Sequence, residues 1–145
     1  MTLFAVTAIS LWACNCAIGR DMVRCDYYVA KNHDLSHQKD CINYAKSIDK
    51  DSMFAKASWY YLLGGDKNSA IKSAKEALKI GHHFAGEYIG FAYLMEKNDK
   101  EAKKYLNDFK QKVKNIEYVK RDIETLKSIY KGFDSIKAYN ILFGK

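Results

Sequence analysis

Cysteine and histidine residues with the spacing of either a disulfide or a metal site lie in the first third of the chain. Cys25 and Cys41 enclose His33 and His37 in the sequence. Two sulfur and two nitrogen atoms form a donor set that binds Zn²⁺ in tetrahedral geometry. In an oxidising compartment, the same two cysteines would form a disulfide. The residue types therefore leave a disulfide and a zinc site as alternatives.

Two helices joined by a short turn position these side chains. We expect helices over about residues 20–31 and 36–48, with the turn at 32–35. A hairpin symmetric about His33 places Cys25 opposite Cys41, and a disulfide that closes a loop of this length stabilises by roughly 3 kcal/mol. His33 then lies in the turn and not on a helix face, and no Cys-x-x-Cys pair is present. The pattern favours the disulfide over zinc.

The sequence contains no recognisable catalytic motif. A Gly-rich phosphate loop, a Ser/His/Asp elbow and a His-Glu-x-x-His motif are all missing from the chain. We therefore expect a protein that is not an enzyme and needs no cofactor.

The charge is basic and concentrated near the C-terminus. The formal net charge is +7, and Lys and Arg outnumber Asp and Glu over residues 100–145. Such a surface attracts an acidic protein, nucleic acid or anionic lipid. Because the lysines are spread around the expected helices, without aromatic residues interleaved on one face, we expect no specific nucleic-acid binding.

Composition predicts one helical domain. The chain has 145 residues, of which 48% are hydrophobic and 28% charged, and it contains no proline. This length is sufficient for a continuous core, and helix-forming residues dominate without sustained strand alternation. The predicted fold class is all-α.

Two further helical hairpins follow, over residues 51–83 and 84–115. In the first, we expect Ser52 to cap a helix that ends at Gly64 and Gly65, and Gly81 to end the second helix. Small residues recur on one face of that second helix and on the corresponding faces of the next hairpin, which predicts close helix crossings. These residues are Ala70, Ala74 and Ala77, followed by Gly90 and Ala102.

This pattern resembles the tetratricopeptide repeat, and Sel1-like repeats are its nearest competitor. The matching residues are Phe54, Ala57, Ser58, Tyr61, Ala70, Ala74 and Ala77 in one unit and Ile89, Gly90, Tyr93 and Ala102 in the next. The resemblance implies an α-solenoid of stacked antiparallel helix hairpins over residues 17–145. A degenerate hairpin at 20–50 would precede the two repeats, and a helix pair at 116–145 would cap them.

The resemblance also implies a concave groove that binds a partner. Its lining positions in this chain are Ala55, Trp59, Leu62, Leu63, Phe84, Glu87, Phe91, Leu94 and Met95. An apolar groove with aromatic anchors suits an amphipathic helix or an apolar peptide, while the basic C-terminal surface suits an acidic partner. The alternative is that these side chains are core, covered by neighbouring repeats or by the helix at 133–143.

The first residues resemble a bacterial export signal. Residues 1–13 are apolar and uncharged but too short to span a membrane. The following Cys14, in the context Leu11-Trp12-Ala13-Cys14, resembles the acylated cysteine of bacterial lipoproteins. We expect residues 1–16 to be an export signal or an apolar N-terminal segment, with Cys14 as a candidate lipidation site and the periplasm or cell envelope as the location.

Together these features predict a non-catalytic scaffold or adaptor of the bacterial cell envelope. By analogy with the family, it would be an accessory subunit of a larger machine such as a flagellar motor or a secretion system. Its contact with the membrane would come only from a lipid anchor. A small helical protein that binds zinc or nucleic acid is the alternative.

Overall fold

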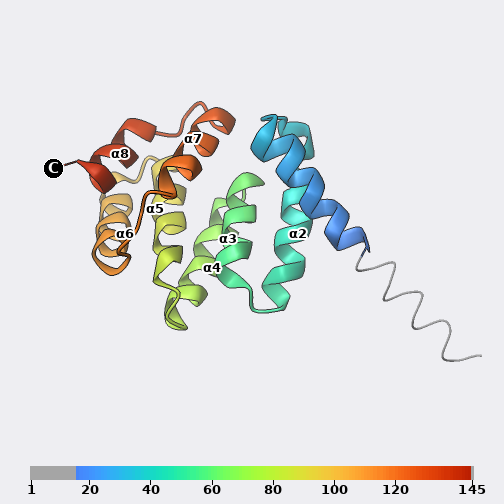
Figure 1. The fold of residues 1–145 in the computed structure, drawn as a ribbon, viewed down its shortest axis with the longest axis horizontal. Helices are drawn as coiled ribbons and strands as arrows, with labels where there is room; N and C mark the ends of the chain where they lie inside the picture. The colour runs from blue at the N-terminus through green and yellow to red at the C-terminus, as the bar shows by residue number, and fades with distance from the viewer. Residues whose placement is uncertain (1–15, 145) are drawn as a thin grey trace, which may run out of the picture.

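The computed structural model describes residues 16–144, and all of their regular secondary structure is helical (Figure 1). The predicted all-α class is therefore confirmed. Helical residues 16–24 continue into the π-helix η1 (Cys25–Lys31). The elements that follow are η2 (Leu35–His37), α2 (Gln38–Lys50), α3 (Phe54–Leu63), α4 (Lys67–Lys79), η3 (His83–Ala85), α5 (Gly86–Met95), α6 (Asp99–Lys112), α7 (Val119–Ile129) and α8 (Ser135–Phe143).

The export-signal prediction for residues 1–16 and the lipidation prediction for Cys14 fall almost wholly outside the described residues. Within the described part of the chain, no helix combines the length and the apolar character needed to cross a bilayer.

Side-chain caps and glycines set the helix ends. Asp66 caps α4, because its carboxylate accepts a hydrogen bond from the Ser69 amide at 3.0 Å, and such a cap stabilises a helix by about 1 kcal/mol. Gly65 and Gly81 adopt left-handed backbone angles just after α3 and α4, as their predicted role as helix stops requires. Ser52 does not cap α3. It takes a left-handed conformation after the C-terminus of α2, with φ of 61°, and α3 begins two positions later at Phe54.

Consecutive helices from α2 to α6 pack against one another, and small residues allow their close approach. Ala70 on α4 is fully buried, and its carbonyl oxygen accepts a hydrogen bond from the Ser58 hydroxyl on α3 at 2.8 Å. Gly90 on α5 lies directly against Leu106 on α6, so that a Cβ at this position would collide with the leucine side chain. Small residues therefore lie at both helix pairs, where the sequence predicted close crossings.

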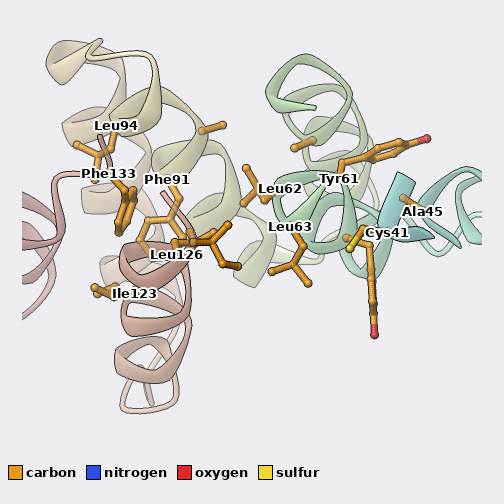
Figure 2. Packing of buried hydrophobic residues seen from close by; sticks show 14 of the residues in the cluster. Cys41, Ala45, Tyr61, Leu62, Leu63, Phe91, Leu94, Ile123, Leu126 and Phe133 are labelled. Carbon is orange, nitrogen blue, oxygen red and sulfur yellow. The ribbon is translucent and has the colours of Figure 1, made fainter. Parts of the chain in front are cut away.

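The last two helices complete the core. Figure 2 shows Ile123 and Leu126 of α7 together with Phe133 packed around Phe91 of α5. The rings of Phe91 and Phe133 meet edge to face, with their centroids 5.6 Å apart. Residues 119–143 therefore bury one face of α5 that would otherwise be exposed.

Candidate interaction surface

A disulfide joins η1 to α2 at the place where the sequence predicted either a disulfide or zinc. Cys25 and Cys41 are both fully buried, and their Cα atoms are 4.9 Å apart. The disulfide prediction is confirmed. The bond occupies both sulfur atoms that the zinc alternative requires, and His33 lies in a left-handed turn while His37 contacts Asp40 at 2.8 Å. Among residues 16–144, no group of three or more His, Cys, Asp or Glu side chains is arranged to hold a metal.

Most of the predicted concave groove is core. The buried members are Ala55, Leu62, Leu63, Glu87, Phe91 and Leu94. Phe91 and Leu94 pack with Phe133 and α7 in the close view (Figure 2). The C-terminal helices therefore cover this part of the face, whereas Ala55 belongs to a second buried cluster with residues of α4, η3 and α5. Both forms of cover belong to the alternative in which these side chains are core. Trp59 and Met95 are half-buried, and Phe84 is exposed.

Glu87 is the unexpected member of this core. Its side chain is fully buried, and neither carboxylate oxygen accepts a hydrogen bond of ordinary geometry from the described residues. Burial, and after it the nearby carboxylate of Asp122 on α7, raise the pKa of Glu87 to about 9, although the Tyr88 hydroxyl and Arg121 oppose the shift. Glu87 is thus protonated at neutral pH, which removes the large cost of a buried unpaired charge.

Asp122 is also largely buried, and burial raises its pKa as well. Arg121 opposes this shift, because its Nε lies 3.5 Å from Asp122 Oδ1. The two carboxyl groups are therefore held in different ways, one by keeping its proton and the other by a neighbouring cation.

Trp59 lines a cleft of about 430 Å³ beside this pair. Its wall carries Asp26 and Asp122 together with Lys31 and Arg121, so the charges balance. Asp26 already accepts a hydrogen bond from the Tyr60 hydroxyl at 2.9 Å. The cleft shows no preference for the charge of a ligand.

A second cleft, of about 410 Å³, lies where several turns meet at one edge of the molecule. Its apolar walls come from η2, the end of α5 and the α7–α8 turn. Lys67 and Lys131 are the cationic residues of its lining. The full lining is Leu35, Gly65, Lys67, Met95, Ile129, Tyr130, Lys131, Gly132 and Phe133.

Hydrogen bonds of Tyr130 hold one wall of this cleft in position. Its hydroxyl donates to the Leu62 carbonyl oxygen at 2.7 Å and lies 3.0 Å from that of Leu63. The amide nitrogen of Gln38 donates to the Tyr130 hydroxyl at 2.7 Å and to the Leu63 carbonyl oxygen at 3.1 Å. Carbonyls at the end of α3 are thereby satisfied by side chains from α2 and from the end of α7, which ties three parts of the chain together.

Two neighbouring hollows extend the cleft along α6 and α8. The first, of about 400 Å³, shares Lys131, Gly132 and Phe133 with it. The second, of about 470 Å³, shares Asp99 and Lys137 with the first and reaches Ile141. We call the surface formed by these three neighbouring hollows, from Leu35 to Ile141, the turn-edge groove.

Lysines dominate the charge of the turn-edge groove. They are Lys67, Lys97, Lys103, Lys131 and Lys137. The acidic residues that line it, Asp99 and Asp134, both form ion pairs with Lys137. Within residues 16–144, the other four lysines form no ion pair. The turn-edge groove therefore combines an apolar hollow with lysines that form no ion pair with the described residues.

The sequence predicts little of this groove. It indicates a basic C-terminal region, and it assigns Met95 to the concave groove, which is a different surface. It does not predict that Leu35 and the α7–α8 turn lie on the same edge, because no local pattern indicates such a meeting. Comparison of the chain with protein-family models, with characterised proteins and with solved structures finds no match. The resemblance to tetratricopeptide repeats stays a prediction from the residues quoted above.

Proposed function

We propose that this protein is a non-catalytic scaffold of the bacterial cell envelope that binds another protein through the turn-edge groove. The observation that carries the proposal is the recessed apolar cleft between Leu35, Met95 and Phe133, bordered by unpaired lysines. Recessed apolar surface with a few polar groups at its rim is typical of binding sites. The Tyr130 hydrogen bonds hold the walls of the cleft in one arrangement, and such preorganisation lowers the entropic cost of binding.

The proposed architecture is a stack of helix hairpins of the tetratricopeptide type. Its support is the packing of each helix from α2 to α6 on the next, with Ala70 and Gly90 at the close contacts. In such a stack, the turns within the hairpins gather along one edge. The turn-edge groove would then be a product of the repeat, with α7 and α8 as the cap that closes it.

The disulfide supports the proposed location. Cysteines in a reducing cytosol are kept as thiols, whereas the bacterial periplasm allows disulfides to persist. The Cys25–Cys41 disulfide is compatible with export, and the apolar residues 1–13 are compatible with an export signal. A lipid anchor at Cys14 and membership of a larger envelope machine are further parts of this proposal.

Co-purification from the native host tests the function. The exposed Leu35, in the groove, and Ile136, on α8 outside the groove lining, form a matched pair of large apolar side chains. We expect Leu35→Asp to abolish recovery of a specific partner that the wild type and Ile136→Asp both retain. Equal recovery by both variants would contradict a role for the groove. Accessibility to an added protease before and after outer-membrane permeabilisation would locate the protein independently.

A further inference from the structure

We infer that the partner presents to the turn-edge groove an acidic segment that carries one bulky apolar side chain. This inference rests on the proposed function and adds the chemistry of the partner to it. Its basis is that an apolar cleft and lysines without ion pairs to the described residues lie along the same surface.

The shape and apolar lining of the cleft suit a large apolar side chain of the partner. Leu35, Met95 and Phe133 line it, and its volume of about 410 Å³ accommodates a large side chain together with part of its backbone. Leu35 is 44% exposed, so the wall of the cleft is accessible from solvent. Aromatic and large aliphatic anchors that fill such hollows supply most of the affinity at protein interfaces.

The lysines at the rim of the groove suit acidic residues on both sides of that apolar side chain. Lys67 and Lys131 line the cleft itself, whereas Lys97 and Lys103 lie farther along the groove. Asp99 and Asp134 share Lys137 as their ion-pair partner, so the five lysines and two acids of the lining present a net charge of +3 to a bound segment. The positive charge comes mainly from the four lysines that form no ion pair with the described residues. Carboxylates on both sides of the anchor would compensate them, and complementary charge also speeds association.

A protein segment fits these observations better than an anionic membrane. The apolar residues of the groove lie in a hollow, whereas a flat bilayer needs apolar side chains that project from the surface. The most exposed large apolar side chains, Ile136 at 73% and Val23 at 60%, are outside the groove lining. An extended segment that follows the three neighbouring hollows from Leu35 to Ile141 matches this arrangement.

Synthetic peptides test the inference directly. The probe is a short peptide with one central Trp between flanks of Asp and Glu. One control replaces the acids by Asn and Gln, and a second replaces the Trp by Ala. Binding to the full chain is measured by fluorescence anisotropy at low salt, and the site is located from the amide NMR signals of Lys131, Gly132 and Phe133.

We expect the acidic Trp peptide to bind about ten-fold more tightly than either control and to shift these signals. Exposed ion pairs contribute about 0.5 kcal/mol each to the binding free energy. A neutral peptide that lacks about three of them therefore binds about ten-fold more weakly. The double variant Lys97→Gln/Lys131→Gln should lose about five-fold in affinity. Its charge-matched control is Lys46→Gln/Lys72→Gln, on exposed positions of α2 and α4, which should bind as the wild type does.

The other outcomes overturn the inference. A neutral Trp peptide that binds the groove equally well would remove the acidic requirement while leaving the proposed function standing. No saturable binding of any peptide, or shifts confined to other residues, would reject the acidic anchored segment. The separate Leu35→Asp co-purification would then decide the proposed function. Binding to phosphatidylglycerol vesicles through the same lysines, without a peptide response, would assign the surface to a membrane.

Discussion

The hydroxyl of Tyr130 closes the C-terminal end of α3 by donating to the carbonyl oxygen of Leu62 at 2.7 Å. Burial raises the pKa of Tyr130 above its ordinary value, so the hydroxyl keeps its proton and remains a donor. This one side chain connects the end of α7 with the middle of the chain and forms part of the wall of the turn-edge groove.

Tyr130→Phe should therefore destabilise the protein. The change removes a partly buried hydroxyl that donates to Leu62 and accepts from Gln38, which leaves both groups without that partner. We expect the free energy of unfolding to fall by about 1–2 kcal/mol in urea denaturation. Tyr139→Phe, which removes a hydroxyl bonded to the exposed Glu124, is the control and should change it by less than about 0.5 kcal/mol. Equal effects of the two changes would contradict the role of Tyr130.

Loss of the Cys25–Cys41 disulfide should cost roughly 3 kcal/mol, because the bond restricts a short loop in the unfolded chain. Wild-type protein with and without reductant is compared in urea denaturation. In the double variant Cys25→Ala/Cys41→Ala, added reductant should have no further effect. Mass spectrometry after alkylation without reduction would show both thiols modified if the bond were absent from the native protein, which would contradict the assignment.

Glu87→Gln should stabilise the protein at neutral pH. The folded chain raises the pKa of Glu87 from 4.5 to about 9. Over that range the native state keeps a proton that the unfolded state releases, so this residue makes the free energy of unfolding fall as pH rises. Glutamine presents a similar neutral side chain without this penalty. We expect a gain of about 2–3 kcal/mol at pH 7 that shrinks toward pH 5.

The matched control for this prediction is Glu96→Gln, on the exposed turn after α5. It should leave both the stability and its pH dependence nearly unchanged. If wild type and Glu87→Gln lost stability in parallel between about pH 5 and pH 8, the buried proton would be excluded as the cause.

Gly90→Ala should disrupt the contact between α5 and α6. An added Cβ would collide with the side chain of Leu106, which is fully buried. Overpacking of this kind costs about 1–3 kcal/mol. Gly132→Ala is the natural control, since a Cβ at that position meets no atom within 4 Å. Thermal unfolding of the two variants checks the prediction, and equal melting temperatures would contradict it.

Local patterns were sufficient to predict most helices and several of their ends. Gly65 and Gly81 stop helices because they reach left-handed backbone angles without strain. Symmetry about His33 favours a disulfide between Cys25 and Cys41 over the zinc alternative, and the structure contains this disulfide. The prediction that Ser52 caps α3 was wrong, because the backbone at Ser52 is left-handed, which is uncommon for a residue with a Cβ.

Long-range packing was beyond what these patterns contain. Phe91 and Leu94 would be apolar both in a stack with an open groove and in a stack whose groove is filled by α7 and α8. The sequence pattern therefore does not show that they are buried. The sequence predicts Glu87 at the surface of a groove, because an ionisable side chain is rarely buried without a partner. The turn-edge groove depends on Leu35 meeting the α7–α8 turn, far along the chain, and helical periodicity carries no information on that meeting.

The hydrogen bond between Gln38 and Tyr130 also bears on the order in which the chain folds. It joins residues 92 positions apart, whereas α3 with α4 and α5 with α6 pair neighbours in sequence. Short loops close at lower entropic cost than long ones, so we expect the hairpins to form early and α7 to dock last. Until residues 119–143 have been made and have folded back, Phe91 and its neighbours stay exposed. A chain truncated before α7 would therefore present its core to solvent and aggregate.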